Sequence, residues 1–206
     1  MCRVILLTLI AVVDSEAQRV KPLFEIFATY GRPALAASVA DAYAPSGGIR
    51  AGGGVGAAVG ALVGGVEIAA FYEFGSASIA RAASSGTPRD LTRSAAGLRL
   101  EAPLAELGRE FRGIVSGSLF VQTLDDVTVA RASAPTQSLT VSQTGAIGAR
   151  AELGVEHRGF IGTTWFVTGG VAAAGAGRGA WQENTTQRGG IGVAPIITLG
   201  LRTRTW

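Results

Sequence analysis

TGAIGARAELGVEHRGFIGTTWFVTGGV, residues Thr144 to Val171, is the stretch with the clearest pattern in this chain. From Ile147 to His157 the odd positions are apolar up to the final histidine, whereas the even positions carry glycine or a charge of either sign. A period of two is that of a β-strand, whose successive side chains point to opposite faces. After a break at residues 157–159, a second run from Phe160 is rich in Thr, Trp, Phe and Val. The stretch predicts two long strands joined by a short turn.

The apolar face of this predicted hairpin must be covered, either by a second sheet in a soluble protein or by lipid in a membrane barrel. The composition favours lipid, because only 16% of the residues are charged, against about 25% in typical soluble domains. Hydrophobic residues make up 48% of the chain, yet no Leu-, Ile- and Val-rich run has the form of a conventional membrane helix. Such diffuse hydrophobicity is typical of a transmembrane barrel, in which only alternate residues face lipid.

The first 17 residues have the pattern of a secretory signal peptide: Arg3, an apolar run Val4–Val13, and small residues at Ser15 and Ala17. The rival interpretations are a buried strand and a short anchor helix, but the run is too short to cross about 30 Å of bilayer core as a helix. We predict a signal peptide over 1–17 and a barrel over 18–206. The only cysteine, Cys2, lies in the removed part, which excludes disulfides and thiolate sites from the mature chain.

Further stretches with the same alternation bring the predicted total to eight strands. The links after the first, third, fifth and seventh strands are long, and those between them are short. Long outer loops, short periplasmic turns and an even strand number are typical of small transmembrane barrels. We therefore predict an all-β, eight-stranded, antiparallel, up-and-down transmembrane β-barrel. The predicted strands are 23–31, 49–66, 66–74, 94–104, 113–124, 147–157, 160–171 and 191–206; residues 127–130 are compatible with a strand extension, and 175–190 is predicted as a loop.

Residues 49–66 allow two interpretations. Gly52, Gly56, Gly60 and Gly64 recur every four residues, and no charge lies between Arg50 and Glu67. Small residues at this spacing let transmembrane helices approach closely, as in a glycine-zipper helix. The spacing is also even, so in a strand the same glycines would form one interior stripe. Glycine costs about 1 kcal/mol per residue in a helix interior, so we favour the strand.

The charged faces of the predicted strands are interpreted as the inside of the barrel. An eight-stranded barrel is just wide enough for side chains to fill, and buried charges must be paired. We predict a structural network of ion pairs in a filled lumen; the alternative is that some of these carboxylates form a catalytic pair. The predicted members, six acids and five bases, are Glu25, Glu67, Glu73, Arg99, Glu101, Arg150, Glu152, Glu156, Arg158, Arg202 and Arg204.

No other feature of the sequence indicates chemistry. His157 is the sole histidine, and with no cysteine partners it makes a poor metal site, so it is predicted to be a solvated residue of a periplasmic turn. The net charge of +3 does not gather into a basic patch with interleaved aromatics, which argues against nucleic-acid binding. We predict no catalytic residue, no cofactor and no metal.

The chain resembles the small outer-membrane β-barrel proteins, the OmpA/OmpX-like porin-type superfamily of Gram-negative bacteria. FEIFATYG at residues 24–31 is similar to their first strand, GARAELGVEHRGFIGTTWFV at 148–167 to their penultimate hairpin, and LGLRTRTW at 199–206 to their terminal strand. The resemblance implies residence in the outer membrane, contact with its lipid, and recognition of Trp206 by the barrel-assembly machinery. It implies a non-enzymatic protein with a structural, adhesive or surface role through its loops. The alternatives are a lipid-modifying barrel enzyme and a soluble, lipocalin-like binding protein.

Overall fold

The computed structural model describes residues 20–35, 48–79, 89–130, 138–159, 162–175, 178–182, 185–188 and 190–203. The predicted signal peptide, Arg204 and Trp206 therefore lie outside the described residues. Within them, all regular structure is β-strand. The strands are β1 (Lys21–Gly31), β2 (Gly52–Val63), β3 (Val66–Ile79), β4 (Arg89–Glu106), β5 (Phe111–Ala130), β6 (Ser138–Arg158), β7 (Thr163–Gly175), β8 (Arg178–Gln182), β9 (Thr185–Arg188) and β10 (Gly192–Thr203).

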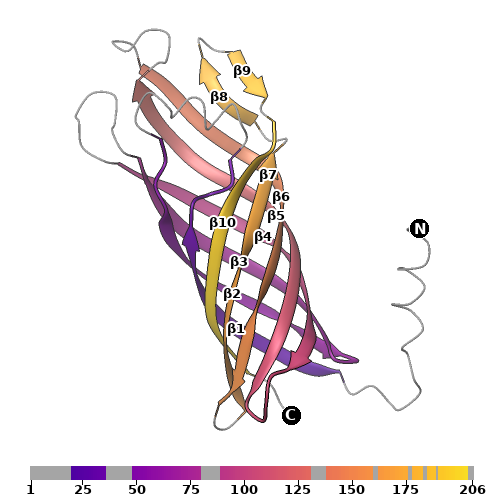
Figure 1. Cartoon of the computed structure of the whole chain (residues 1–206). Coiled ribbons are helices and arrows are strands. Elements are labelled where there is room, and N and C mark those ends of the chain that lie inside the picture. Colours follow the sequence, from indigo (N-terminus) through magenta and orange to yellow (C-terminus); the bar gives the residue numbers. More distant parts are fainter. Residues whose placement is uncertain are drawn as a thin grey trace, which may run out of the picture.

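Eight of these strands close into an antiparallel barrel (Figure 1). Each of β1 to β7 pairs with its neighbour in sequence, and β10 pairs with both β7 and β1, so the ring has no open edge. Closure removes the unpaired backbone groups that an exposed sheet edge would present to lipid. The predicted eight-stranded, up-and-down fold is confirmed.

The two rims of the barrel differ in the length of their links, as the sequence predicts. The short-turn rim carries the turns between β2 and β3, β4 and β5, and β6 and β7, and the end of β10 lies near it (Figure 1). Each of these turns contains a glycine with a positive φ, at Gly64 and Gly65, Gly108 and Gly162, where a side chain would be strained. The long-loop rim, at the other end, carries the long links.

β2 is a strand, so the glycine-zipper helix is excluded for this segment. Val55 and Val59 point outward, whereas Gly56 and Gly60 face neighbouring backbone so closely that a Cβ on Gly60 would lie 2.1 Å from the Ile68 carbonyl oxygen. The glycines at these two positions thus allow close approach. The predicted stripe is wrong at Gly64, which lies in the turn after β2.

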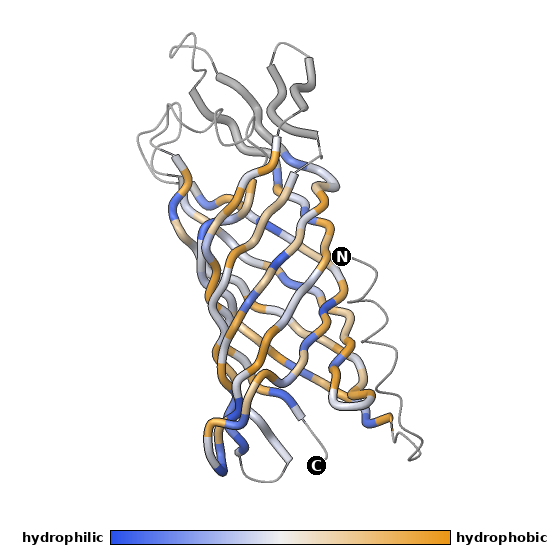
Figure 2. Tube along the Cα trace, turned by 45° about the vertical axis from the view of Figure 1, so that its right-hand side comes forward, coloured by the Kyte–Doolittle hydropathy of each residue, from blue (hydrophilic) through white to orange (hydrophobic). Residues whose placement is uncertain are grey.

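The outer face of the barrel is apolar and the inner face is polar. Along the strands, hydrophobic and hydrophilic residues alternate (Figure 2). Large hydrophobic side chains stand exposed at alternate positions of every barrel strand, for example Leu98 on β4 and Leu119 on β5. Contiguous apolar surfaces are rare on soluble monomers, and this one indicates a surface covered by another apolar phase. Over the described ranges, no helix has the length and apolar character needed to span a membrane.

The strands continue beyond the ends that the alternation predicts. β5 and β6 remain paired as far as Ala130 opposite Ser138, and β8 adds to the upper part of β6. β9 then pairs with β8, so four strands rise past the long-loop rim as an outer sheet, defined here as β8, β9, residues 125–130 and residues 138–144 (Figure 1). The prediction of residues 175–190 as a loop is therefore wrong over β8 and β9, because backbone pairing continues where apolar alternation stops.

Candidate functional site

The polar lumen is the candidate site, because it gathers most of the charged side chains that the sequence places on inward faces. Of the eleven predicted members, nine are buried inside the barrel: Glu25, Glu67, Glu73, Arg99, Glu101, Arg150, Glu152, Glu156 and Arg202. Arg158 does not belong to the buried set. It is exposed at the short-turn rim, where β6 ends and the inward face opens to solvent.

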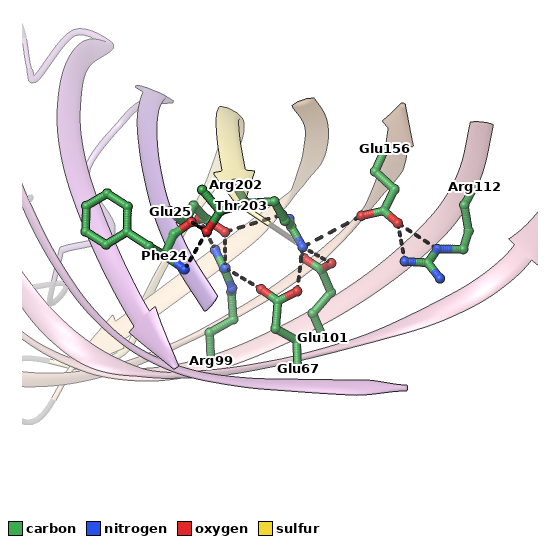
Figure 3. A network of polar contacts seen from close by, with 9 residues as sticks. All are labelled: Phe24, Glu25, Glu67, Arg99, Glu101, Arg112, Glu156, Arg202 and Thr203. Carbon is green, nitrogen blue, oxygen red and sulfur yellow. Dashed lines mark hydrogen bonds and ion pairs between the residues drawn. The ribbon is translucent and has the colours of Figure 1, made fainter. Parts of the chain in front are cut away.

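Arg202 on β10 is the centre of the larger group of charges, the inner cluster (Figure 3). Its guanidinium binds Glu101 through both terminal nitrogens, with Nη2 2.9 Å from Glu101 Oε2, and its Nη1 lies 2.8 Å from Glu67 Oε2. Glu67 and Glu101 are direct register partners on β3 and β4. Two carboxylates in these positions repel each other, and the positive charge of the arginine that both bind offsets this repulsion.

Arg99 completes the inner cluster on the side of β1. Its Nη1 donates to Glu25 Oε1 at 2.7 Å, and its Nη2 lies 3.2 Å from Glu67 Oε1 (Figure 3). Arg112 on β5 binds Glu156, which lies 3.8 Å from Arg202 Nη1 at its other oxygen. Three arginines thus connect four glutamates on six strands. Planar guanidinium groups suit this role because they bind carboxylates through two parallel hydrogen bonds.

A second group, the outer cluster, is centred on Glu73 of β3. Arg150 Nη2 donates to Glu73 Oε2 at 2.6 Å, and Arg93 and the Thr29 hydroxyl both donate to Glu73 Oε1. The neighbouring carboxylate, Glu152, accepts hydrogen bonds from the hydroxyls of Thr168 and Thr198, at 2.9 and 2.7 Å. These threonines come from β7 and β10, on the same side of the ring as Glu152 on β6, whereas the Arg150–Glu73 pair joins β6 to β3 across the lumen.

Aromatic rings separate and support the charged groups. The Arg202 guanidinium carbon lies 4.0 Å from the centroid of Phe166, and that of Arg150 lies 4.8 Å from the centroid of Phe120. Each ring in turn occupies the space where its cross-strand partner, a glycine, has no side chain: Phe166 lies over Gly200 and Phe120 over Gly148. Cation–π contact and ring–glycine packing therefore fill the lumen at the level of the ion pairs.

Sequence reasoning missed two members of the network, Arg93 and Arg112. Each lies one residue outside a predicted strand, 94–104 and 113–124, because no apolar alternation marks the strand ends. The structure places Arg93 in β4 and Arg112 in β5 with their guanidinium groups turned inward. One signal could have found Arg112. It is a charged residue directly before the predicted strand 113–124, and its even number places it on the same face as the residues predicted to point inward.

The lumen is filled, and its carboxylates are engaged with arginines or hydroxyls. Two enclosed spaces between the described side chains measure about 20 and 10 Å³, room for about one water molecule each. Among the residues that the structure describes, no three His, Cys, Asp or Glu side chains are grouped so that they could hold a metal ion. The arrangement favours a structural network over a catalytic pair.

His157 is not the solvated turn residue that the sequence predicts. It lies in β6 on the outer face near the short-turn rim, stacked on Trp165 at 5.0 Å between ring centroids and in edge contact with Phe111. Its Nε2 lies 3.2 Å from Glu110 Oε2. Aromatic residues at this level are typical of the belt where a barrel meets the membrane–water interface.

The closed ring of eight strands, the apolar exterior and the filled polar lumen define a small transmembrane-type β-barrel. No known family model and no curated protein sequence matches the chain. The solved structure of Neisserial surface protein A has a TM-score of 0.59 at 12% identity, over 89% of this chain and 97% of that one. The likeness is one of fold, and it confirms at that level the predicted resemblance to small outer-membrane barrels.

Two more distant structures also align. The N-terminal β-barrel domain of Pseudomonas aeruginosa OprF gives a TM-score of 0.41 at 14% identity, over 91% of this chain and all of that domain. The outer-membrane protease OmpT of Escherichia coli gives 0.30 at 11% identity, over 95% of this chain and all of that one. These TM-scores are too low for either protein to inform the site.

Proposed function

We propose that the protein is a non-enzymatic barrel of the bacterial outer membrane that presents its outer sheet at the cell surface. In this proposal the short-turn rim faces the periplasm and the long-loop rim faces outward. Lipid covers the apolar exterior, and the barrel-assembly machinery inserts the chain after removal of residues 1–17. The observation that carries the proposal is the combination of a lipid-compatible exterior with a lumen that the ion pairs fill.

The filled lumen argues against the soluble alternative. A lipocalin-like protein encloses its ligand in the barrel and presents polar side chains to water. Here the arrangement is reversed, since Arg202 and Glu25 are buried inside while Ile26 and Leu201 on the same strands stand exposed outside. The described part of the lumen leaves no cavity for a ligand of ordinary size.

The position of the histidine argues against the lipid-modifying enzyme. An enzyme that acts on outer-leaflet lipid would need a nucleophile and a base near the long-loop rim. His157 is the only histidine of the chain, and it packs between Phe111 and Trp165 near the short-turn rim. With the long-loop rim outward, this position lies on the periplasmic side of the membrane.

The outer sheet supports a role in surface binding. It extends the paired backbone of β5 and β6 beyond the barrel and adds β8 and β9 to it. A barrel that only sealed the membrane would need no such extension. Binding residues are commonly carried on segments that a rigid scaffold holds in place, and this sheet is anchored to the barrel through two of its longest strands.

Membrane fractionation tests the location. We expect the protein to stay with the membrane after carbonate washing and to migrate more slowly on gels after boiling than before, because an unheated barrel stays folded in detergent. Solubility without detergent, together with migration that does not change on heating, would contradict the proposal.

Replacement of the outer sheet tests the surface role. In one variant a two-residue Asn-Gly turn joins residue 124 to residue 145, and residues 176–189 are replaced by a short Gly-Ser link. We expect this barrel to retain heat-dependent migration and its membrane location but to lose adhesion of whole cells to host-cell or matrix surfaces. Equal adhesion by cells carrying the intact and the shortened proteins would contradict the surface role alone.

A further inference from the structure

The segment that follows β1 enters the barrel at the long-loop rim. Residues Arg32–Leu35, called here the mouth strap, leave β1 after Gly31, and Ala34 and Leu35 are buried at 3% and 7% exposure. The Ala34 carbonyl oxygen accepts a hydrogen bond of 2.9 Å from Gln122 Nε2. Gln122 is on β5, which is four strands from β1 in either direction around the ring, so the strap is held from the opposite side.

A glycine on the barrel makes room for the strap. Gly192 is the first residue of β10, and a Cβ at this position would lie 1.6 Å from the Leu35 carbonyl oxygen. No side chain can be accommodated at that distance, so any other residue at 192 must push the strap away. By contrast, a Cβ on Gly169 of β7 would meet nothing within 4 Å.

Below the strap lies a small polar space, the vestibule. It measures about 20 Å³ and is lined by Pro33 and Ala34 of the strap and by Thr29, Arg93 and Gln122 of the barrel. The inner end of the vestibule is closed, because Glu73 binds Arg93 and Arg150 directly beneath it and the inner cluster follows. The vestibule therefore does not continue into the rest of the lumen.

Two buried amides lack hydrogen-bond partners in the protein, and one of them, Gln122, lines the vestibule. Gln122 Oε1 and both amide atoms of Gln143 have none, and neither side chain is more than 1% exposed. Leaving such groups unpaired in the interior is unfavourable. Entry of water or of a small polar solute into the vestibule would satisfy Gln122 Oε1, which lowers the free energy of an opened state relative to the closed one.

We propose that the mouth strap is a lid over this vestibule. When the strap moves outward, Gln122 exchanges the Ala34 carbonyl for solvent, and small hydrogen-bonding solutes reach the Gln122 amide and Thr29. The paired arginines and glutamates below stay in place, so opening of the lid does not create a pore. This inference goes beyond the proposed surface role and does not depend on it.

Cysteine labelling tests the lid. Ala77 on β3 is buried and lines the vestibule, and in a Cys2→Ser background Ala77→Cys supplies a unique thiol. We expect a small, membrane-impermeant thiol reagent to label the folded protein slowly. Gly192→Ala should make labelling about 5- to 150-fold faster, which is the shift in equilibrium that overpacking of a filled site typically produces. Gly169→Ala, the matched control, should leave the rate unchanged.

Two further measurements separate a lid from other arrangements. Ser116→Cys, buried beside the inner cluster at the register position of Glu101, should stay unlabelled with either residue at 192 if the vestibule does not continue into the rest of the lumen. Heat-dependent gel migration verifies that each variant is folded. Complete protection of the Ala77→Cys thiol in the parent, an unchanged rate in Gly192→Ala, or labelling at position 116 would each overturn the proposal.

Discussion

Glu25 and Arg202 lie directly opposite each other across the seam that closes the barrel, with Arg202 Nε 3.5 Å from Glu25 Oε2. The seam joins β1 to β10, the first and last strands of the chain. Both side chains are fully enclosed, so their charges are compensated only by protein groups. Charge compensation therefore depends on closure of the barrel, because Arg202 completes the inner cluster only when β10 pairs with β1.

The first prediction concerns Arg202. Arg202→Met removes the guanidinium that lies among Glu25, Glu67 and Glu101, while Arg99 still binds Glu25 and Glu67. Leaving a buried charge without its partner costs about 3–5 kcal/mol, and we expect that loss in the free energy of unfolding, measured by urea titration in lipid vesicles. Arg158→Met, at an exposed rim position, should cost less than about 1 kcal/mol. Equal losses would contradict the central role of Arg202.

The second prediction concerns the coupling between Arg202 and Glu101. Because Glu101 is held by both terminal nitrogens of Arg202, Glu101→Gln removes the negative charge that Arg202 binds most directly. The double variant should therefore be more stable than the sum of the two single losses predicts, with a coupling of about 0.5–3 kcal/mol. The same cycle between Arg202 and Thr29, a residue of the other cluster, should give a coupling near zero.

The third prediction concerns the glycines beneath the lumen aromatics. Phe27 on β1 lies over Gly56 on β2, and a Cβ at Gly56 would be 2.4 Å from the ring. Gly56→Ala should lower the free energy of unfolding by about 1–3 kcal/mol, because the ring must move into a filled lumen. Gly169→Ala has free space and should not be destabilising. A loss at Gly169 as large as that at Gly56 would indicate a backbone effect instead of a packing effect.

The fold could be predicted from the sequence because the geometry of a membrane barrel determines two visible patterns. Apolar and polar residues alternate along each strand, and long and short links alternate between strands. The strand number and the inward phase of residues such as Glu25, Glu73 and Arg202 follow from a period of two, and the two kinds of rim follow from the lengths of the links. The strand ends do not, since the hydrogen-bonded ladder between β5 and β6 continues to Ala130 and Ser138 where side chains no longer face lipid.

The identity of the ion pairs could not be predicted either. Pairing in the lumen depends on the relative register of strands that are far apart in sequence, and one sequence does not contain that register. Arg158, an expected base, is exposed, and Arg93 and Arg112 are found with guanidinium groups in the lumen; Arg204 lies outside the described residues. The balance of charge is thus easier to predict than the residues that provide it.

The last prediction concerns how the cost of a charge on the outer face depends on its depth in the bilayer. Leu119 on β5 is 67% exposed in the middle of an outward apolar surface, whereas Leu107 is exposed in the turn between β4 and β5. If lipid covers the barrel, Leu119→Arg should cost about 2–4 kcal/mol and Leu107→Arg about 0–1 kcal/mol, because the penalty falls from the bilayer midplane to the interface. Urea unfolding in vesicles measures both values. A barrel exposed to water would show no such difference, because an arginine on either surface would then be equally solvated.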